Sequence, residues 1–309
     1  MRVNSASSEL PSEDAVFRRG LTAGLGAYLV WGLAPLYFKL LQAVRADEII
    51  AHRVIWSIGF LLLILLMRHR ADVVRHVRIP RTVALALLAS SVLLAINSLL
   101  FVQAVHAGRV LETSLGYFIS PMVSVVLGLV LLSEQLLSSQ RWAVLLAAAG
   151  TAYLFFSIEP LPWFALGIAI SWGLYGLVRK VTNVGPMVGL LWETVLMAPA
   201  AIAWLFWLDQ RGEQLFGQLG IDTDALLIGT GMITVVPLVL FATAARSLPL
   251  ITLGLMQYIA PTMSFLLAVF LFREPFTWTH AVAFSAIWCA LFIYSMAGWR
   301  RARSMAMNH

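Results

Sequence analysis

Apolar runs close to twenty residues long recur along the whole chain, and short stretches with charge, proline or glycine separate them. A helix of about twenty residues rises far enough to cross the roughly 30 Å hydrocarbon core of a bilayer. The pattern therefore predicts an all-α membrane protein with ten transmembrane helices. The expected ranges are 20–41, 48–67, 82–105, 110–132, 140–158, 161–181, 186–208, 225–246, 250–272 and 277–299.

Similar stretches of sequence occur in both halves of the chain. GAYLVWGLAPLYFKL, from Gly26, and GIAISWGLYGLVRKV, from Gly167, agree at six of fifteen positions, and the last shared position holds the only two lysines, Lys39 and Lys180. A second match, in nearly the same register, pairs Pro121, Ser124 and Glu134 with Pro261, Ser264 and Glu274. Matches in the same order and in nearly the same register predict the duplication of a five-helix unit.

The predicted organisation is a disordered cytoplasmic tail at 1–19, five-helix repeats at 20–158 and 161–299, and a basic cytoplasmic tail at 300–309. Because five is odd, the copies enter the membrane from opposite sides as inverted repeats (5+5), the architecture of alternating-access carriers. When alternate loops are assigned to alternate sides, fifteen of the 21 Lys and Arg residues fall on the side of both termini. The positive-inside rule therefore predicts that both termini are cytoplasmic.

Composition narrows the function classes. Of the 309 residues, 61% are hydrophobic and 12% are charged, which excludes a soluble two-domain enzyme. The net charge of +6 is read as a topology signal and not as a nucleic-acid surface. The single cysteine, Cys289, forms no intrachain disulfide and no thiolate metal cluster. No cofactor or metal is expected, and without a Walker A motif we expect no ATP-binding domain.

Three prolines inside predicted spans, Pro35, Pro121 and Pro261, are candidates for helix breaks or hinges. Proline leaves the carbonyl four residues before it without its helical partner, so Tyr117 and Gln257 are candidates to line a central substrate cavity. The alternative is that these prolines only bend the helices for packing.

Glu193 is the only carboxylate well inside a predicted span. It would bind an amine or carry a proton, or else form a structural pair or a neutral hydrogen-bonded acid. Arg53 holds the equivalent place in the first repeat, near the outer end of its helix. Because the repeats are inverted, we expect the two to lie about 10 Å apart in depth, without a direct salt bridge.

The ends of the first four helices gather charged residues at the predicted outer mouth. We expect an outer gate there, with Arg53 pairing with Glu48 or Glu112, or else residues that only pair with one another or reach the headgroups. The gate candidates are Lys39, Glu48, His52, Arg53 and Glu112.

Trp31 and Trp172 lie mid-span at equivalent positions of the repeat, each followed by a glycine. They either wall a cavity together with Tyr175 and Tyr258, or pack against a glycine face. Asn97 offers a hydrogen-bonding group to substrate or to a neighbouring helix.

The sequence also resembles a known family. The run WGLAPLYFKLLQAVRADEIIAHRVIWS (31–57) is similar to the opening of RarD-type permeases of the EamA family, in the drug/metabolite transporter superfamily. LETSLGYFISP (111–121), SWGLYGLVRK (171–180) and QYIAPTMSFLLAV (257–269) extend the resemblance over nearly the whole chain beyond the N-terminal tail.

The resemblance implies a ten-helix inverted-repeat carrier of the bacterial inner membrane, with a cavity between its halves. It implies transport, often export, of a small metabolite, amino acid or drug, and leaves open a proton gradient, exchange or facilitated diffusion as the driving force. A channel and a membrane-embedded enzyme are the alternatives. The enzyme alternative has little support, because the sequence shows none of the paired carboxylates, HExxH motif or Ser/His pair that such chemistry needs.

Overall fold

The computed structural model describes residues 12–69, 77–107, 109–157, 161–271 and 278–306, and within these ranges the protein is built of helices joined by short turns. The helices are α1 (Glu13–Lys39), α2 (Ala46–His69), α4 (Arg81–His106), α5 (Val110–Leu131), α6 (Ser138–Phe156), α7 (Trp163–Val181), α8 (Pro186–Gln210), α9 (Ile221–Ser247), α10 (Leu250–Met256), α11 (Ile259–Leu266), the π-helical turn η2 (Leu267–Leu271) and α12 (Trp278–Ala306).

Helical structure occupies each of the ten ranges expected from the apolar runs. Among the described residues, eight of these segments are long and apolar enough to cross a membrane, by length and composition. One of the eight is the broken segment Leu250–Leu271. In α12 the apolar part is shorter and spans Ala281–Ala297. The expected all-helical membrane fold is confirmed.

Two helix ends differ from the expected boundaries. The first helix begins at Glu13, inside the segment expected to be a disordered tail, because Ser12 caps it by accepting the N–H of Ala15 at 3.3 Å. Glu13 and Asp14 in the first turn are favoured there by the helix dipole. At the other end, α12 continues to Ala306, past the expected end at 299. The rest of both expected tails, 1–11 and 307–309, lies outside the described residues, as does Glu274 of the repeat match.

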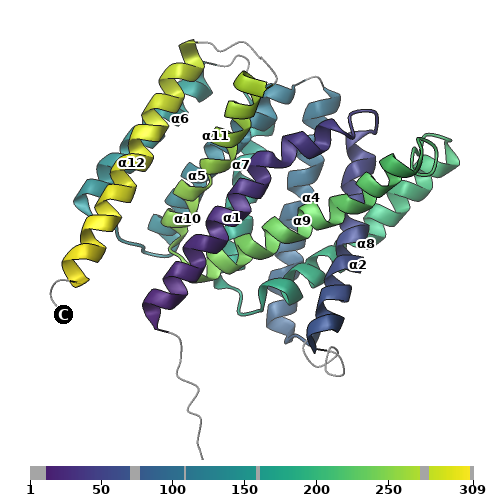
Figure 1. Cartoon of the computed structure of the whole chain (residues 1–309), viewed down its shortest axis with the longest axis horizontal. Coiled ribbons are helices and arrows are strands. Elements are labelled where there is room, and N and C mark those ends of the chain that lie inside the picture. The colour runs from purple at the N-terminus through teal and green to yellow at the C-terminus, as the bar shows by residue number, and fades with distance from the viewer. Residues whose placement is uncertain (1–11, 70–76, 108, 158–160, 272–277, 307–309) are drawn as a thin grey trace, which may run out of the picture.

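Helices α1 and α7 occupy the middle of the bundle and pack against helices on both sides (Figure 1). α1 packs on α9 and α11, and α7 packs on α4 and α5. α2 also packs on α9, and α8 packs on α4. α6 and α12 lie side by side at one edge of the bundle. The expected repeat would match α1 to α7, α4 to α9 and α5 to the α10–α11 segment. The contacts of α1 with α9 and α11 then correspond to those of α7 with α4 and α5.

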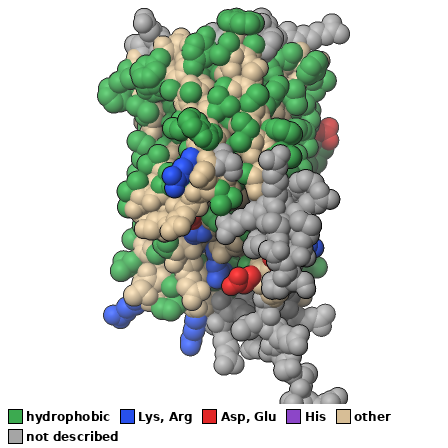
Figure 2. All heavy atoms as spheres, turned by 90° about the vertical axis from the view of Figure 1, so that its left-hand side faces the viewer, with side chains coloured by type: hydrophobic (Ala, Val, Ile, Leu, Met, Phe, Trp, Pro, Cys, Tyr) green, Lys and Arg blue, Asp and Glu red, His purple; other side chains and the backbone are tan. Residues whose placement is uncertain are grey.

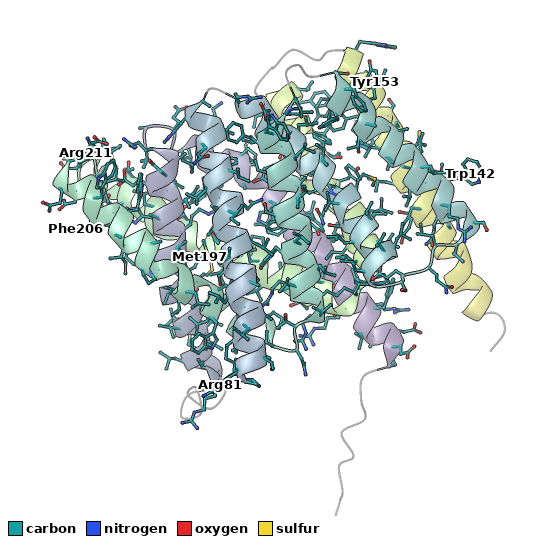
Figure 3. All side chains as sticks on the ribbon, turned by 180° about the vertical axis from the view of Figure 1, so that it is seen from behind. Arg81, Trp142, Tyr153, Met197, Phe206 and Arg211 are labelled. Atoms are coloured by element: carbon teal, nitrogen blue, oxygen red, sulfur yellow. The ribbon has the colours of Figure 1, made fainter. Side chains whose placement is uncertain are left out.

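The surface has the character expected in lipid. Large apolar side chains are exposed, among them Trp142 and Phe156 on α6. Figure 2 shows hydrophobic side chains over the upper part of the α6–α12 face and Lys or Arg side chains in its lower part. From behind, Arg81 lies at the lower end of the bundle, whereas Arg211 and Tyr153 lie toward the upper end (Figure 3). Arg81 and Arg211 therefore lie toward opposite ends of the bundle.

Candidate functional site

Five aromatic rings from α1, α7 and α9 meet where the two halves of the chain join; we call them the aromatic cluster. Trp31 and Trp172 lie 5.3 Å apart, ring centre to ring centre, at an interplanar angle of 80°. Phe241 lies 5.2 Å from Trp172 and 5.8 Å from Tyr175, and Tyr28 lies 5.7 Å from Trp31. The two tryptophans are partly exposed, whereas the other three side chains are buried. The residues expected to be equivalent by the repeat are thus in direct contact.

The glycines that follow the tryptophans allow close helix approach. A Cβ at Gly32 would lie 2.5 Å from the Cβ of Met263 on α11. A Cβ at Gly173 would lie 2.5 Å from a methyl of Val123 on α5. The register that pairs Pro121 with Pro261 also pairs Val123 with Met263, so the same packing contact is made twice. The tryptophans therefore contact each other beside a glycine face, which fits the packing alternative, and the cavity-wall alternative stays a prediction.

Glu193 lies at the junction of α4, α7 and α8, and we call the residues around it the inner polar cluster. Ser90 donates a hydrogen bond of 2.6 Å to Oε1, and Tyr175 donates one of 3.4 Å to Oε2. The guanidinium of Arg179 lies 3.4 Å from Oε1. Glu193 is 0% exposed and Arg179 is 1% exposed. Of the alternatives for Glu193, the geometry favours a structural ion pair.

Arg179 was missed as a site residue, because its place beside Lys180 suggests a cytoplasmic loop cation. It lies instead in the last turn of α7, with its guanidinium over Gly189, and donates to the carbonyl of Pro186 at 3.2 Å. One signal was available in the sequence: Tyr175 and Arg179 are one turn apart and share a helix face.

Among the described residues, Arg53 does not pair with the expected gate partners, Glu48 and Glu112, but contacts other residues of α1 and α9. Its Nε donates a hydrogen bond of 2.9 Å to the hydroxyl of Thr234 on α9. Its guanidinium carbon lies 5.6 Å from the ring centre of Phe38 on α1. It also interacts electrostatically with the hydroxyl of Tyr117 on α5, a side chain that is 39% exposed. Glu193 pairs with Arg179, and among the described residues it forms no salt bridge with Arg53.

The expected pairing of Arg53 with Glu48 or Glu112 is wrong, because backbone groups and other cations occupy these carboxylates. Glu48 accepts the N–H groups of Leu215 at 2.9 Å and Phe216 at 3.0 Å. Glu112 forms an ion pair with Arg109 and accepts the N–H of Phe164 at 3.1 Å.

The other outer-mouth candidates surround these contacts. His52 accepts a hydrogen bond from the indole of Trp56 at 3.2 Å, and its Nε2 lies 3.8 Å from Glu48. Lys39 is exposed in the last turn of α1. In the turn that follows, a hydrogen bond to Asp47 raises the pKa of Arg45.

Three cavity candidates make helix–helix contacts. Asn97 donates to the carbonyl of Ile168 and to Ser171, both at 3.0 Å. The hydroxyl of Tyr258 lies 2.7 Å from that of Thr151 on α6. Gln257 donates to Ser124 at 2.9 Å, whereas Tyr117, its counterpart in the expected repeat, is exposed.

Only one of the three hinge candidates accompanies a helix break in the described residues. α1 continues through Pro35 and α5 through Pro121. The chain breaks between α10 and α11, just before Pro261, where the carbonyl of Gln257 accepts the N–H of Ala260 at 3.2 Å in a tighter turn.

A groove of about 300 Å³ lies between α4 and α8 and is lined by apolar side chains together with Arg81. Its wall includes Leu85, which is 68% exposed, so the groove faces the apolar surface. The described residues contain no group of three or more His, Cys, Asp or Glu side chains placed to hold a metal ion.

The comparisons with known proteins agree over nearly the whole chain. The model of the EamA-like transporter family matches twice, at residues 18–156 and 162–296. An uncharacterized transporter of Pseudomonas aeruginosa is 41% identical over 291 residues, which cover 94% of this chain and 98% of the relative. Protein RarD of Escherichia coli is 42% identical over 280 residues, covering 90% of this chain and 94% of the relative.

A more distant relative, the chloramphenicol-sensitive protein RarD of Pseudomonas aeruginosa, is 30% identical over 92% of this chain and 95% of its own length. A solved crystal structure at 17% identity aligns with a TM-score of 0.73, covering 93% of this chain and 99% of the other, and so shares the fold. The chain therefore belongs to the EamA-like transporter family as a RarD-type permease, a multi-pass membrane transporter and not an enzyme.

Proposed function

We propose that this permease is a secondary transporter of the bacterial inner membrane that moves small organic metabolites or drugs by alternating access between two inverted five-helix repeats. The two matches to the family model support the duplication, since one falls in each half. The reciprocal contacts of α1 and α7 with helices of the opposite half support the inverted relation.

The observation that carries the proposal is the contact between Trp31 and Trp172. Each tryptophan comes from the first helix of its half, and the two rings meet at 5.3 Å. Both are partly exposed, so they offer aromatic surface at the junction of the halves. Such a place suits an organic substrate bound between two moving bodies.

Two deep contacts join the halves and suit the role of gates. Arg53 on α2 holds Thr234 on α9, and Glu193 on α8 holds Ser90 on α4. The repeat makes these helix pairs equivalent, so one contact lies toward each end of the bundle. Alternating access would break them in turn.

We further propose that both termini face the cytoplasm. The start of α1 and the end of α12 lie at the same lower end of the bundle in Figure 1. Arg81 lies at the lower end as well (Figure 3), which agrees with an excess of basic residues on the cytoplasmic side.

The test is uptake into proteoliposomes that contain the purified full chain, against a panel of amino acids, aromatic metabolites and chloramphenicol. A carrier gives flux that saturates with substrate, whereas a channel gives flux that rises in proportion to concentration. If no compound moves faster than in empty liposomes, the transport proposal is overturned for this substrate range.

Proton coupling is tested at Glu193, the deep carboxylate of the inner polar cluster. If Glu193 carries the coupling proton, folded Glu193→Gln alters the pH dependence of transport between mildly acidic and mildly alkaline conditions; its size-exclusion profile is measured first, because the variant leaves Arg179 without its counter-charge. Rates that keep the wild-type pH profile in this variant would leave Glu193 with a structural role only, and would point to exchange or facilitated diffusion.

A further inference from the structure

We propose that Arg53 binds a negatively charged group of the substrate, so that the transported compounds are small organic anions with an aromatic or apolar body. This inference rests on the proposed transport function and narrows its substrate class. It follows from a difference between two charged residues inside the membrane spans: Glu193 has an oppositely charged partner within the protein, and Arg53 has none among the described residues.

The carboxylate of Glu193 is satisfied within the protein, while Nε of its partner Arg179 is buried without a hydrogen bond among the described residues. Both carboxylate oxygens of Glu193 have partners, Ser90 and Arg179 on one and Tyr175 on the other. The cluster is closed to solvent, since Glu193 and Arg179 are at most 1% exposed. A positive and a negative charge cancel here, so the inner polar cluster favours neither sign of substrate.

The outer charge is not satisfied. Nε of Arg53 donates to a neutral hydroxyl, that of Thr234. Among the described residues, Nη1 and Nη2 form no hydrogen bond or ion pair, and the Arg53 side chain is partly exposed. A guanidinium inside a membrane span is expensive without an anionic partner, so a ligand that supplies one gains the interaction.

The inverted repeat explains why this cation lacks a counter-ion. The register that aligns Lys39 with Lys180 also aligns Phe38 with Arg179. The register that aligns Pro121 with Pro261 also aligns Arg53 with Glu193. The second half therefore places an ion pair where the first half places a guanidinium on a phenyl ring, at 5.6 Å. A cation–π contact leaves the positive charge in place.

The carboxylates of the neighbouring elements are engaged elsewhere. On α2, Asp47 pairs with Arg45, and Glu48 accepts backbone N–H groups of the 213–217 turn. In that turn, Glu213 pairs with Arg45 and Arg211. On α5, Glu112 pairs with Arg109. Within the described residues, no carboxylate near the outer mouth is bonded to Arg53.

The surroundings of Arg53 indicate the body of the substrate. Phe38 lies two turns from Trp31 on the same face of α1, about 10 Å along the helix axis. Exposed Tyr117 adds a ring from α5. A compound with a ring near the tryptophans and a carboxylate at Arg53 spans this length, and the planar guanidinium is suited to bind both carboxylate oxygens.

Matched pairs of compounds test the inference directly. Indole-3-acetate and phenylacetate are compared with indole-3-acetamide and phenylacetamide, within a wider set of organic carboxylates, by binding to the detergent-purified full chain. Each pair keeps the ring and removes the charge. We expect the carboxylates to bind at least about tenfold tighter than the amides, because hydrogen bonds to a charged partner contribute more than neutral ones.

Variants test whether Arg53 causes the preference for carboxylates over amides. Arg53→Gln is expected to remove the difference between carboxylate and amide, and Arg53→Lys is expected to keep part of it, since an ammonium retains the charge but not the planar pair of donors. Arg211→Gln, which removes a cation from an exposed turn, is the matched control and should keep the full preference. Size-exclusion profiles and melting temperatures establish that each variant is folded.

The result that overturns the inference is equal binding of amides and carboxylates, a preference that survives in folded Arg53→Gln, or a set in which no carboxylate binds. Transport is read separately in proteoliposomes. Uptake of uncharged or cationic compounds that is unaffected by Arg53→Gln overturns the anion inference and leaves the carrier intact. Absence of uptake for every compound overturns the carrier itself.

Discussion

Arg179 and Glu193 form a buried ion pair between neighbouring helices, with Nη1 of the arginine 3.4 Å from Oε1 of the carboxylate. Both side chains are almost fully inaccessible, at 1% and 0% exposure. Ser90 joins them from the other half of the chain, 103 residues away from Glu193. The pair therefore fixes where α4, α7 and α8 meet.

Removing one partner of this pair should be strongly destabilising. We expect Glu193→Ala to lower the free energy of unfolding by roughly 3–5 kcal/mol, because it leaves a buried guanidinium without its counter-charge. The double variant Arg179→Met with Glu193→Leu should recover most of the loss. Denaturant unfolding in detergent measures both. Glu213→Ala, at a half-exposed pair, is the control and should change stability by less than about 1 kcal/mol. An equal loss in the control would contradict the prediction.

The glycine contacts beside the tryptophans predict a sensitivity to a single methyl group. Gly32→Ala and Gly173→Ala each place a Cβ 2.5 Å from a neighbouring side-chain carbon. We expect each to lower stability by roughly 1–3 kcal/mol, the usual effect of overpacking. Gly59→Ala on α2 is the matched control, because nothing lies within 4 Å of its Cβ position.

In that control the better helix propensity of alanine should leave stability unchanged or raise it by up to about 1 kcal/mol. Melting temperatures in detergent compare the three variants. If Gly32→Ala melts as the wild type does, the close approach of α1 to α11 is not needed for stability.

The hydrogen bonds of Glu134 indicate that it caps α10, at the start of the broken segment Leu250–Leu271. Its carboxylate accepts the N–H groups of Leu250 at 2.6 Å and Ile251 at 2.9 Å, and Lys180 lies 3.6 Å away. We expect Glu134→Ala to lower stability by about 1–2 kcal/mol, as loss of an N-terminal cap does. Glu134→Gln should be intermediate, since an amide oxygen still accepts hydrogen bonds but carries no charge. The same ranking should appear in hydrogen exchange at the start of α10, and an unprotected α10 in the wild type would refute the cap.

The aromatic cluster predicts an effect on transport that is separable from folding. Trp31→Phe and Trp172→Phe keep a ring but shorten it, and the loss of an aromatic contact is worth about 0.5–1.5 kcal/mol. We expect the KM for an aromatic substrate to rise by roughly three- to tenfold, with the protein still folded. Trp142→Phe on α6, where the side chain is 71% exposed, is the control. Proteoliposome uptake measures all three, and a KM that rises equally in the control would remove the cluster from the binding site.

The places where sequence analysis was incomplete share a physical cause. Arg179 reads as a loop cation beside Lys180, because the charge pattern along one helix does not show which neighbour will bury its end. Arg53 was paired with Glu48 or Glu112 because they are close in sequence or lie at the same end. The folded chain gives Glu48 to backbone N–H groups of the 213–217 turn and brings Thr234, 181 residues away, to Arg53.

The sequence by itself determined the ten helical ranges, the all-α membrane class and the family, because each of these depends on local hydrophobicity or on residues matched one by one along the chain. The duplication stays a prediction from the same matched residues. Only the tertiary structure decided the partners of the deep charges and the meeting of Trp31 with Trp172, because a side chain inside a bilayer must find its partner on whichever helix packs against it. The packing satisfies Glu193 within the protein, and among the described residues it gives Arg53 only the neutral hydroxyl of Thr234 as a hydrogen-bond acceptor.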